Sequence, residues 1–314
     1  MWLQIPNVMN ARRFIFIFAI LLCTMPFIDT PIALLMGIAL TWLFKHPFPE
    51  TGKIITNKLL KISVVGLGFG MNASQALVAG KEGFVYTLFS ITVTLCAGLL
   101  IGRFLKVDKK SSYLISSGTA ICGGSAIAAI ASVIKPDDRQ TGTALGTIFI
   151  LNSLALLIFP VIGKFLGLSQ HEFGTWAAIA IHDTSSVVGA ASKYGNEALQ
   201  TATTIKLVRA LWIIPLSLFT VFLFNSESKK IKIPWFILFF VGATVLNSTI
   251  PALQTLSPYI VDVSKTGLKI TLFLIGASLT REMVVSTGLK PLVQGLLLWI
   301  FISVVSALSV LYIF

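Results

Sequence analysis

The sequence predicts an all-α polytopic membrane protein with inverted repeats and two broken or re-entrant helices near the midplane of the membrane. Three observations predict this fold: apolar runs recur along the chain, charged residues are scarce, and two of the runs have polar centres. Only 11% of the 314 residues are charged and 55% are hydrophobic, whereas a soluble domain carries about 25% charged residues. Such a chain cannot cover a water-facing surface, and apolar runs of about 20 residues are typical of spanning helices.

No loop between the apolar runs is long enough to fold alone, so we expect a single integral membrane domain over residues 1–314. Arg12 and Arg13 before an apolar stretch resemble a signal peptide, but no small-residue cleavage site follows, and we expect the first run to be retained. The runs that we expect to be helical are 12–28, 31–45, 54–72, 84–103, 112–134, 141–166, 173–194, 199–225, 233–250, 262–280 and 290–313.

The net charge of +12 would suggest a nucleic-acid partner in a soluble protein. Here the basic residues lie between the apolar runs, where they set topology and contact anionic lipid headgroups. We therefore expect the lipid bilayer and no nucleic acid as a partner. The distribution of Lys and Arg favours a multi-pass protein of the bacterial plasma (inner) membrane with a cytoplasmic N-terminus.

The three cysteines, Cys23, Cys96 and Cys122, all lie in apolar runs, and their spacing fits neither a metal site nor a disulfide framework. Metal-ligand clusters, nucleotide-binding loops and dinucleotide fingerprints are absent from the sequence. We expect no cofactor and no bound metal.

Runs 112–134 and 173–194 differ in kind from the others. The first is rich in Gly, Ser and Ala around Gly123 and Gly124, and the second has the polar centre His182 to Ser186. Small and polar residues at mid-depth expose backbone groups. Such irregular backbone persists in a membrane only inside protein or beside a cavity.

The chain also repeats itself. When the sequence is shifted by 60 residues, Ala120–Ser125 lies over Ala180–Ser185 and Gln140–Thr143 lies over Gln200–Thr203. A weaker match relates run 54–72 to run 262–280, through Gly68 with Gly276 among others. Together these matches suggest a duplicated unit, with segments 31–166 and 173–313 as pseudo-symmetric halves.

Charge alone does not decide whether runs 112–134 and 173–194 are re-entrant or cross the membrane. If both are re-entrant, every repeat pair is inverted; if both cross, the two runs are parallel. Inverted repeats with broken helices that meet near the midplane are a recurrent architecture of secondary transporters. We therefore favour re-entrant segments.

A half-helix that begins inside the membrane directs free N–H groups and a positive dipole end at whatever lies there, so it can bind an anion. One such start is expected near Gly123, Gly124 and Ser125. The other is expected near Thr184, Ser185 and Ser186. The alternative is that these small residues serve close helix packing.

Asp183 is the only acidic residue near the middle of an apolar run. An ionisable group at that depth is a functional candidate by default. It could take up a coupling proton, ligate Na⁺ or neutralise a buried cation. His182 beside it either shares this coupling role or is a satisfied structural group.

Lys206 and Arg209 lie three residues apart in run 199–225, on one helix face with Thr203 one turn earlier. We expect either Asp183 or the substrate as their partner, and two cations against one acid favour an anionic substrate. The alternative is that the cations snorkel to the outer surface. Weaker polar candidates are Asn152 and Asn72.

The stretch Gly118–Ala129 resembles the signature of the YeiH-type membrane proteins, a family named for sulfate export. His182 before an acid, then Lys206-Leu207 and Arg209 with Pro215 downstream, resemble its other marked stretches. The chain departs from the pattern at Asp183, where Glu is expected, and at Ser186, where Gln is expected. The resemblance covers nearly the whole chain and implies a fold similar to that of bile-acid symporters, with a panel domain and a core domain that carries the broken helices.

The sequence thus predicts a secondary active transporter of a small anion (sulfate, a sulfonate or a carboxylate) that works by alternating access, coupled to protons or sodium. An anion channel or passive pore is the alternative. An enzyme is not expected, because no nucleophile motif and no second embedded carboxylate occur. A homodimer is compatible with this prediction. The candidate coupling residues are His182 and Asp183, and the candidate substrate-binding residues are Thr119, Cys122, Gly123, Gly124, Ser125, Thr184, Ser185, Ser186, Lys206 and Arg209.

Overall fold

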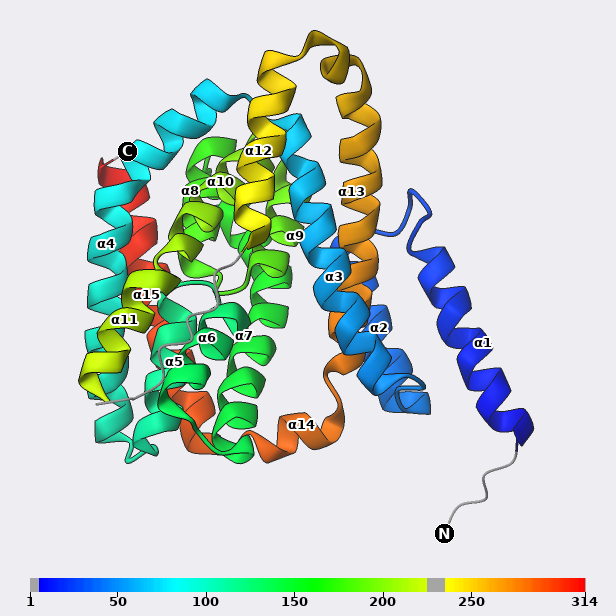
Figure 1. Cartoon of the computed structure of the whole chain (residues 1–314). Coiled ribbons are helices and arrows are strands. Elements are labelled where there is room, and N and C mark those ends of the chain that lie inside the picture. The colour runs from blue at the N-terminus through cyan, green and yellow to red at the C-terminus, as the bar shows by residue number, and fades with distance from the viewer. Residues whose placement is uncertain (1–5, 225–234, 314) are drawn as a thin grey trace.

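The computed structural model describes residues 6–224 and 235–313 (Figure 1). Within these ranges the chain is helical and contains no strand, which confirms the all-α prediction. The elements are α1 Pro6–Leu22, α2 Thr30–Phe44, α3 Pro49–Leu67, the 3₁₀ turn η1 Gly68–Gly70, α4 Ala73–Phe104, α5 Lys109–Ala120, α6 Gly124–Ile134, α7 Asp138–Phe165, α8 Gln170–Ala180, α9 Thr184–Tyr194, α10 Asn196–Leu211, α11 Ile213–Leu223, α12 Trp235–Thr249, α13 Pro251–Ser278, α14 Arg281–Ser286 and α15 Leu289–Ile313.

Each predicted run contains helix, but several bounds differ. Helices α4 and α13 each begin 11 residues, about three turns, before the predicted runs, because polar residues near a helix start do not stop a helix. Pro251 is tolerated because it lies in the first turn of α13. Run 199–225 is divided at Trp212 into α10 and α11. Helix α14 was not expected. The predicted ends at 225 and 233 lie outside the described residues.

Four helical stretches in the described ranges are long and apolar enough to cross a membrane: Thr87–Phe104, Arg139–Phe165, Asn196–Leu223 and Leu289–Tyr312. Large apolar side chains also cover much of the outer surface; Phe104 and Phe165, for example, are 86% and 88% exposed. Such a surface is unfavourable in water but matches hydrocarbon. The chain is therefore organised as a multi-pass membrane protein.

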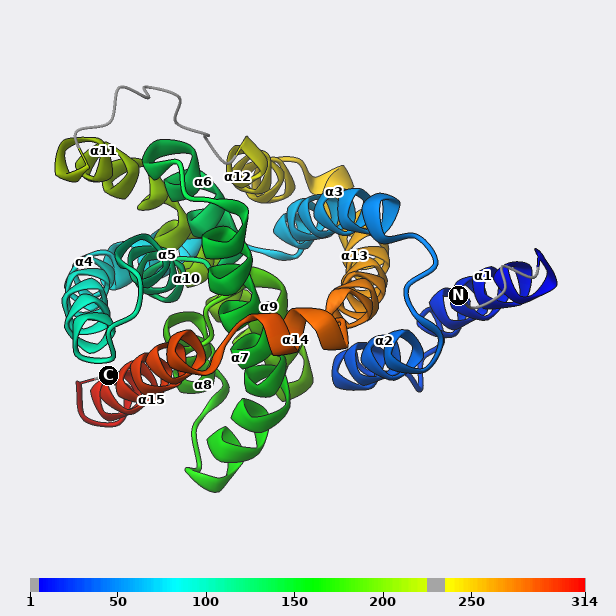
Figure 2. The same cartoon turned by 90° about the horizontal axis from the view of Figure 1, so that it is seen from below.

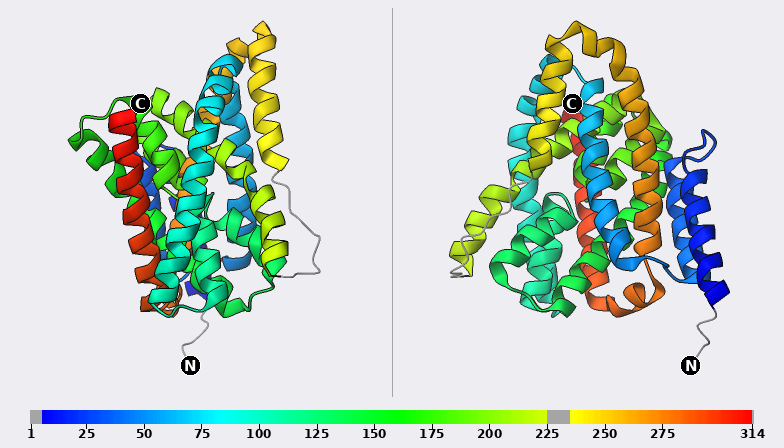
Figure 3. Two further views of the ribbon diagram at one scale, coloured as in Figure 1. Left: turned by 90° about the vertical axis from the view of Figure 1, so that its left-hand side faces the viewer. Right: turned by 45° about the vertical axis from the view of Figure 1, so that its right-hand side comes forward.

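The helices form two groups, which are seen side by side from below in Figure 2. Helices α2, α3, α12 and α13 form the panel group, in which α13 packs against both α2 and α3. Helices α4 to α11 and α15 form the core group, and α4 runs beside α15 in Figure 3. Helix α14 connects the two groups at the lower face, and α1 lies at the outer edge of the panel group (Figure 1).

Candidate functional site

Run 112–134 is a re-entrant hairpin of α5 and α6. The ammonium group of Lys110, at the start of α5, donates a hydrogen bond of 2.9 Å to the carbonyl oxygen of Lys135, directly after α6. The amide of Gln140 donates to Asp108 at 2.8 Å. The hairpin therefore begins and ends at one face of the protein, as predicted. This α5–α6 pair is called the first hairpin below.

Run 173–194 is a second hairpin, made of α8 and α9. The hydroxyl group of Tyr194, at the end of α9, donates to the carbonyl oxygen of Leu168 at 2.5 Å, just before α8. The rings of Phe173 and Tyr194 also stack with centroids 3.8 Å apart. Helix α7 runs from the end of the first hairpin to the start of the second, so the two hairpins enter from opposite faces (Figure 1).

The 60-residue repeat is visible in the helix bounds. Helix α5 ends at Ala120 and α8 at Ala180, while α6 spans Gly124–Ile134 and α9 spans Thr184–Tyr194. The breaks therefore fall at equivalent positions of the repeat. The first contains the pair Gly123-Gly124, and the second begins the polar run from His182. The wider division into halves 31–166 and 173–313 stays a prediction.

The tips of the two hairpins touch each other. Gly123 has a φ of 64°, and a Cβ atom at this position would lie 3.3 Å from both the Cβ atom of Asp183 and the carbonyl oxygen of His182. Helix α7 ties the second tip in place, because the side-chain oxygen of Asn152 accepts hydrogen bonds from the backbone N–H groups of His182 at 3.0 Å and Asp183 at 3.3 Å. We call this meeting point the junction.

Both predicted cations reach the junction from α10, and both are fully buried. The ammonium group of Lys206 donates to the carbonyl oxygens of Ala178 at 3.2 Å and Ile181 at 2.7 Å. The Nε of Arg209 donates to the carbonyl oxygen of Ala120 at 2.7 Å. Each cation thus sits at the negative C-terminal end of one half-helix.

Neither cation reaches a surface, so the alternative that they snorkel is wrong. Both donate hydrogen bonds of 2.7 Å to backbone carbonyls, which were not predicted as partners. These partners could not be predicted from sequence, because α5 and α8 provide their carbonyls only at the positions where the helices break.

The start of α9 is already occupied by the protein itself. Asp183 is the N-cap of α9, and its carboxylate accepts hydrogen bonds from the backbone N–H of Ser185 at 3.1 Å and from the Ser185 hydroxyl group. Thr184, Ser185 and Ser186 are all buried on this first turn. A carboxylate of the chain thus accepts at this helix start, and substrate binding by Thr184, Ser185 and Ser186 stays a prediction.

The start of α6 is different. Its N-cap is Gly123, which has no side chain to accept from the first N–H groups. Gly124 is half-buried and Ser125 is exposed, whereas Cys122 just before the break is buried. Of the two half-helix starts, the α6 start is the one that remains accessible to a ligand.

Several buried polar atoms around the junction have no hydrogen-bond partner among the described residues. They are the hydroxyl oxygen of Thr119, the amide nitrogen of Asn152 and both ring nitrogens of His182. Thr119 and His182 are fully buried and Asn152 is 3% exposed. Because buried polar groups are normally hydrogen-bonded, these atoms mark a place for a polar solute or water. Asn72, in contrast, is exposed before α4.

A cavity of about 360 Å³ opens between the two helix groups, on the side where α10 begins. It was not predicted. Its lining includes Gln200 and Thr203 of α10, Met71 after η1, and Asp262 and Lys265 of α13. Thr203 lies one turn before Lys206, so the cavity extends from this face toward the junction. The charged residues Asp262 and Lys265 near the start of run 262–280 were the sequence feature that could have indicated this cavity.

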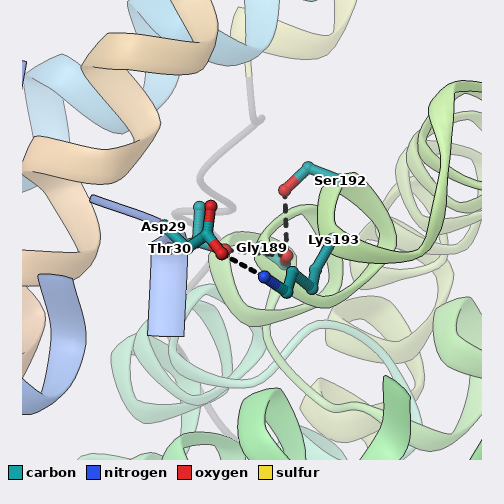
Figure 4. Close-up of polar contacts among 5 residues, drawn as sticks. All are labelled: Asp29, Thr30, Gly189, Ser192 and Lys193. Atoms are coloured by element: carbon teal, nitrogen blue, oxygen red, sulfur yellow. Dashed lines mark hydrogen bonds and ion pairs between the residues drawn. The ribbon is translucent and has the colours of Figure 1, made fainter. Parts of the chain in front are cut away.

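Polar contacts join the two helix groups at the same face. The ammonium group of Lys265 donates to Asn196 at 3.1 Å, and the amide of Gln200 donates to the carbonyl oxygen of Gly70 at 2.9 Å. Figure 4 shows two more, between the α2 start and α9: Lys193 pairs with Asp29, and the hydroxyl group of Thr30 donates to Gly189 at 3.0 Å. The contacts of Lys265, Gln200 and Lys193 are exposed and cost little to break, whereas the hydrogen bond of Thr30 is buried.

Comparison with known proteins places the chain among bacterial membrane proteins. A family model described as conserved hypothetical protein 698 matches residues 11–295. A UPF0324 membrane protein of Bacteroides thetaiotaomicron is 52% identical over 91% of this chain and 87% of the relative. Others from Photobacterium profundum (94% of this chain, 91% of the relative) and Porphyromonas gingivalis (90% and 87%) are each 50% identical. No solved structure matches the chain significantly.

Proposed function

The chain belongs to the UPF0324 family of membrane proteins, and from this premise we propose that it is a secondary transporter of small anions that works by alternating access. The observation that carries the proposal is the meeting of two re-entrant hairpins from opposite faces at Gly123 and Asp183. Broken helices at the midplane of inverted repeats form the solute sites of many secondary transporters. Each hairpin can separate the junction from one side of the membrane.

The charge balance at the junction favours an anion. Two half-helix starts and two half-helix ends carry about half a charge each, of opposite sign, so their contributions cancel. Lys206 and Arg209 against Asp183 then leave one positive charge in a buried place. Sulfate, a sulfonate or a carboxylate would neutralise that charge, and the resemblance to YeiH-type proteins makes sulfate the first solute to test.

The open start of α6 is the proposed contact for the solute. Its first turn, at Gly124 and Ser125, has no side-chain cap. Thr119, whose hydroxyl group has no partner among the described residues, and Ala120, which accepts from Arg209, precede this start in the last turn of α5. Backbone N–H groups at a helix start bind oxyanions without a basic side chain in direct contact. Movement of the core group against the panel group, with breakage of the polar contacts at the cavity, would expose the junction to the other side.

The test is solute counterflow into proteoliposomes that contain the purified chain. We expect saturable uptake of at least one labelled anion, accelerated by the same anion inside the vesicle. An ohmic current without counterflow would point to a channel instead. Absence of uptake for sulfate, sulfonates and carboxylates alike would overturn the proposal.

Substitution of Gly124 by leucine is expected to lower the rate of counterflow at least about tenfold while the protein still folds. A Cβ atom at Gly124 meets only side-chain atoms of Phe149 and Leu145, at 3.5 to 3.7 Å, so a longer side chain fills the mouth of the site rather than the packed interior. Gly142→Leu, in α7 with no atom within 4 Å of its Cβ position, is the matched control. Equal rates in both variants would contradict an anion site at the α6 start.

The Asp183 carboxylate is proposed to couple transport to protons together with His182. We expect Asp183→Asn to transport with little dependence on external pH, whereas the native protein responds to a pH gradient, because the amide can still accept at the α9 start but cannot take up a proton. Initial rates across a range of pH gradients measure this, with Asp29→Asn as the control. A native-like pH response in Asp183→Asn would remove the coupling role.

A further inference from the structure

Lys206 presents an unusual combination of burial and partners. It is fully buried, and its ammonium group donates to two backbone carbonyls, those of Ala178 and Ile181, in the last turn and at the C-cap of α8. The hydrogen bond of 2.7 Å to Ile181 has the length of a charge-assisted contact. A positive charge is therefore held where a half-helix ends in the membrane interior.

Half-helix C-terminal ends and unwound carbonyls are where secondary transporters coordinate coupling cations such as Na⁺. The end of α8 has the same chemistry: carbonyl oxygens without intrahelical partners and a negative dipole end. In this chain the position is filled by an ammonium group that α10 supplies. An ammonium group and a monovalent metal cation have the same charge and both require oxygen acceptors.

We propose that the ammonium group of Lys206 occupies a monovalent-cation site at the end of α8, so that the native protein needs no Na⁺ at the junction and removal of the ammonium group creates a Na⁺ site. The role of this site in transport rests on the proposed function, but the cation site itself can be tested by binding. Because Lys206 occupies the site, we expect protons rather than Na⁺ as the coupling ion.

The first hairpin supports the same reading. The end of α5 is filled by Arg209 through the carbonyl oxygen of Ala120, so α10 supplies one tethered cation to each hairpin. The two differ in chemistry, because a guanidinium group stays charged in proteins whereas a buried ammonium group can lose its proton. Of the two cations, Lys206 is therefore the one that can lose its charge and weaken its hydrogen bonds to the end of α8.

The titratable and charged groups that interact with Lys206 lie on the two hairpins and on α10. They are Cys122 on the first hairpin, His182 and Asp183 on the second, and Arg209 on α10 itself. The carboxylate of Asp183 is the acid of this set. Transfer of the Lys206 proton toward Asp183 or His182 would free the carbonyls of Ala178 and Ile181 and let the second hairpin move.

The experiment compares thermal unfolding of the native protein and Lys206→Ala in NaCl and in choline chloride at equal ionic strength. We expect no Na⁺-specific shift in the native protein and a rise of roughly 2–4 °C in Tm with Na⁺ in Lys206→Ala, since a ligand that binds the folded state stabilises it. Lys206→Arg retains a tethered cation and should show no shift. Lys193→Ala, outside the junction, should behave like the native protein.

If Lys206→Ala does not fold in choline, recovery of folded protein by Na⁺ also supports the site, and Lys206→Gln, which keeps a hydrogen-bond donor, serves for the comparison. Equal Tm values in Na⁺ and choline for both Lys206→Ala and Lys206→Gln would overturn the inference, as would a Na⁺-dependent rate of counterflow in the native protein. Failure of the proposed function is a separate result, namely no counterflow of any anion, and it leaves the Tm comparison intact.

Discussion

Gly123→Ala is expected to abolish most of the solute transport, with a loss of at least about tenfold in the counterflow rate. The residue has a φ of 64° and a ψ of −124°, a combination outside the left-handed α region that side chains with a Cβ atom rarely adopt, and backbone strain of this kind costs about 1–3 kcal/mol. Its Cβ atom would also press on the opposite hairpin, 3.3 Å from the Cβ atom of Asp183 and the carbonyl oxygen of His182. The second hairpin must shift to accept the methyl group, and this displaces the groups that the junction brings together.

Gly167→Ala separates the two effects. This glycine has nearly the same φ of 67°, but no atom lies within 4 Å of its Cβ position. Both alanine variants place a Cβ atom at a positive φ and should lose stability, but only Gly123→Ala should lose transport. Initial counterflow rates normalised to reconstituted protein, together with thermal melts, measure the two quantities. If the two variants transport equally well, contact between the hairpin tips is not required for function.

Gly276→Val is expected to prevent formation of the panel group and to yield no monodisperse folded protein. Helices α2 and α13 are in backbone contact: a Cβ atom at Gly276 would lie 2.2 Å from the carbonyl oxygen of Leu34, and one at Gly37 would lie 2.1 Å from that of Phe273. Backbone atoms cannot rotate away, so the helices would have to separate. Overpacking of a well-packed core costs about 1–3 kcal/mol and occasionally more.

Gly242→Val in α12 is the matched control, because it places the same β-branched side chain in a helix at a position with no atom within 4 Å. Size-exclusion profiles in detergent and thermal melts compare the variants. Gly37→Val should reproduce the defect of Gly276→Val, since the two glycines lie on opposite sides of one helix contact. A well-folded Gly276→Val protein would show that α2 and α13 can separate at little cost.

The places of the two helix breaks could be predicted because their signals are local. The pair Gly123-Gly124 and the polar run from His182 interrupt two apolar segments at positions 60 residues apart, and the helices indeed stop at Ala120 and Ala180. Local propensity was less informative at the edges. Helices α4 and α13 begin before the predicted runs because their first turns are polar. The division between α10 and α11 at Trp212 does not interrupt the apolar run, so hydropathy does not indicate it.

The role of the junction residues could not be predicted in the same way. Asn152 was a weak candidate on sequence grounds, yet its side-chain oxygen holds the backbone of His182 and Asp183, 30 and 31 residues away. Asp183 was expected to take up a proton, ligate Na⁺ or neutralise a cation. Its carboxylate also caps the helix that it begins, a contact that was not predicted.

The sequence by itself determined that the chain is an all-α membrane protein with two broken segments, because composition, apolar run length and small-residue clusters are properties of neighbouring residues. Only the tertiary structure decided that the segments are re-entrant, that their tips meet, and that Lys206 and Arg209 fill the ends of two half-helices. The carbonyl partners of these cations lie 25, 28 and 89 residues away along the chain. Backbone carbonyls are present in every residue, so a sequence cannot show which of them a fold leaves unpaired at a helix end.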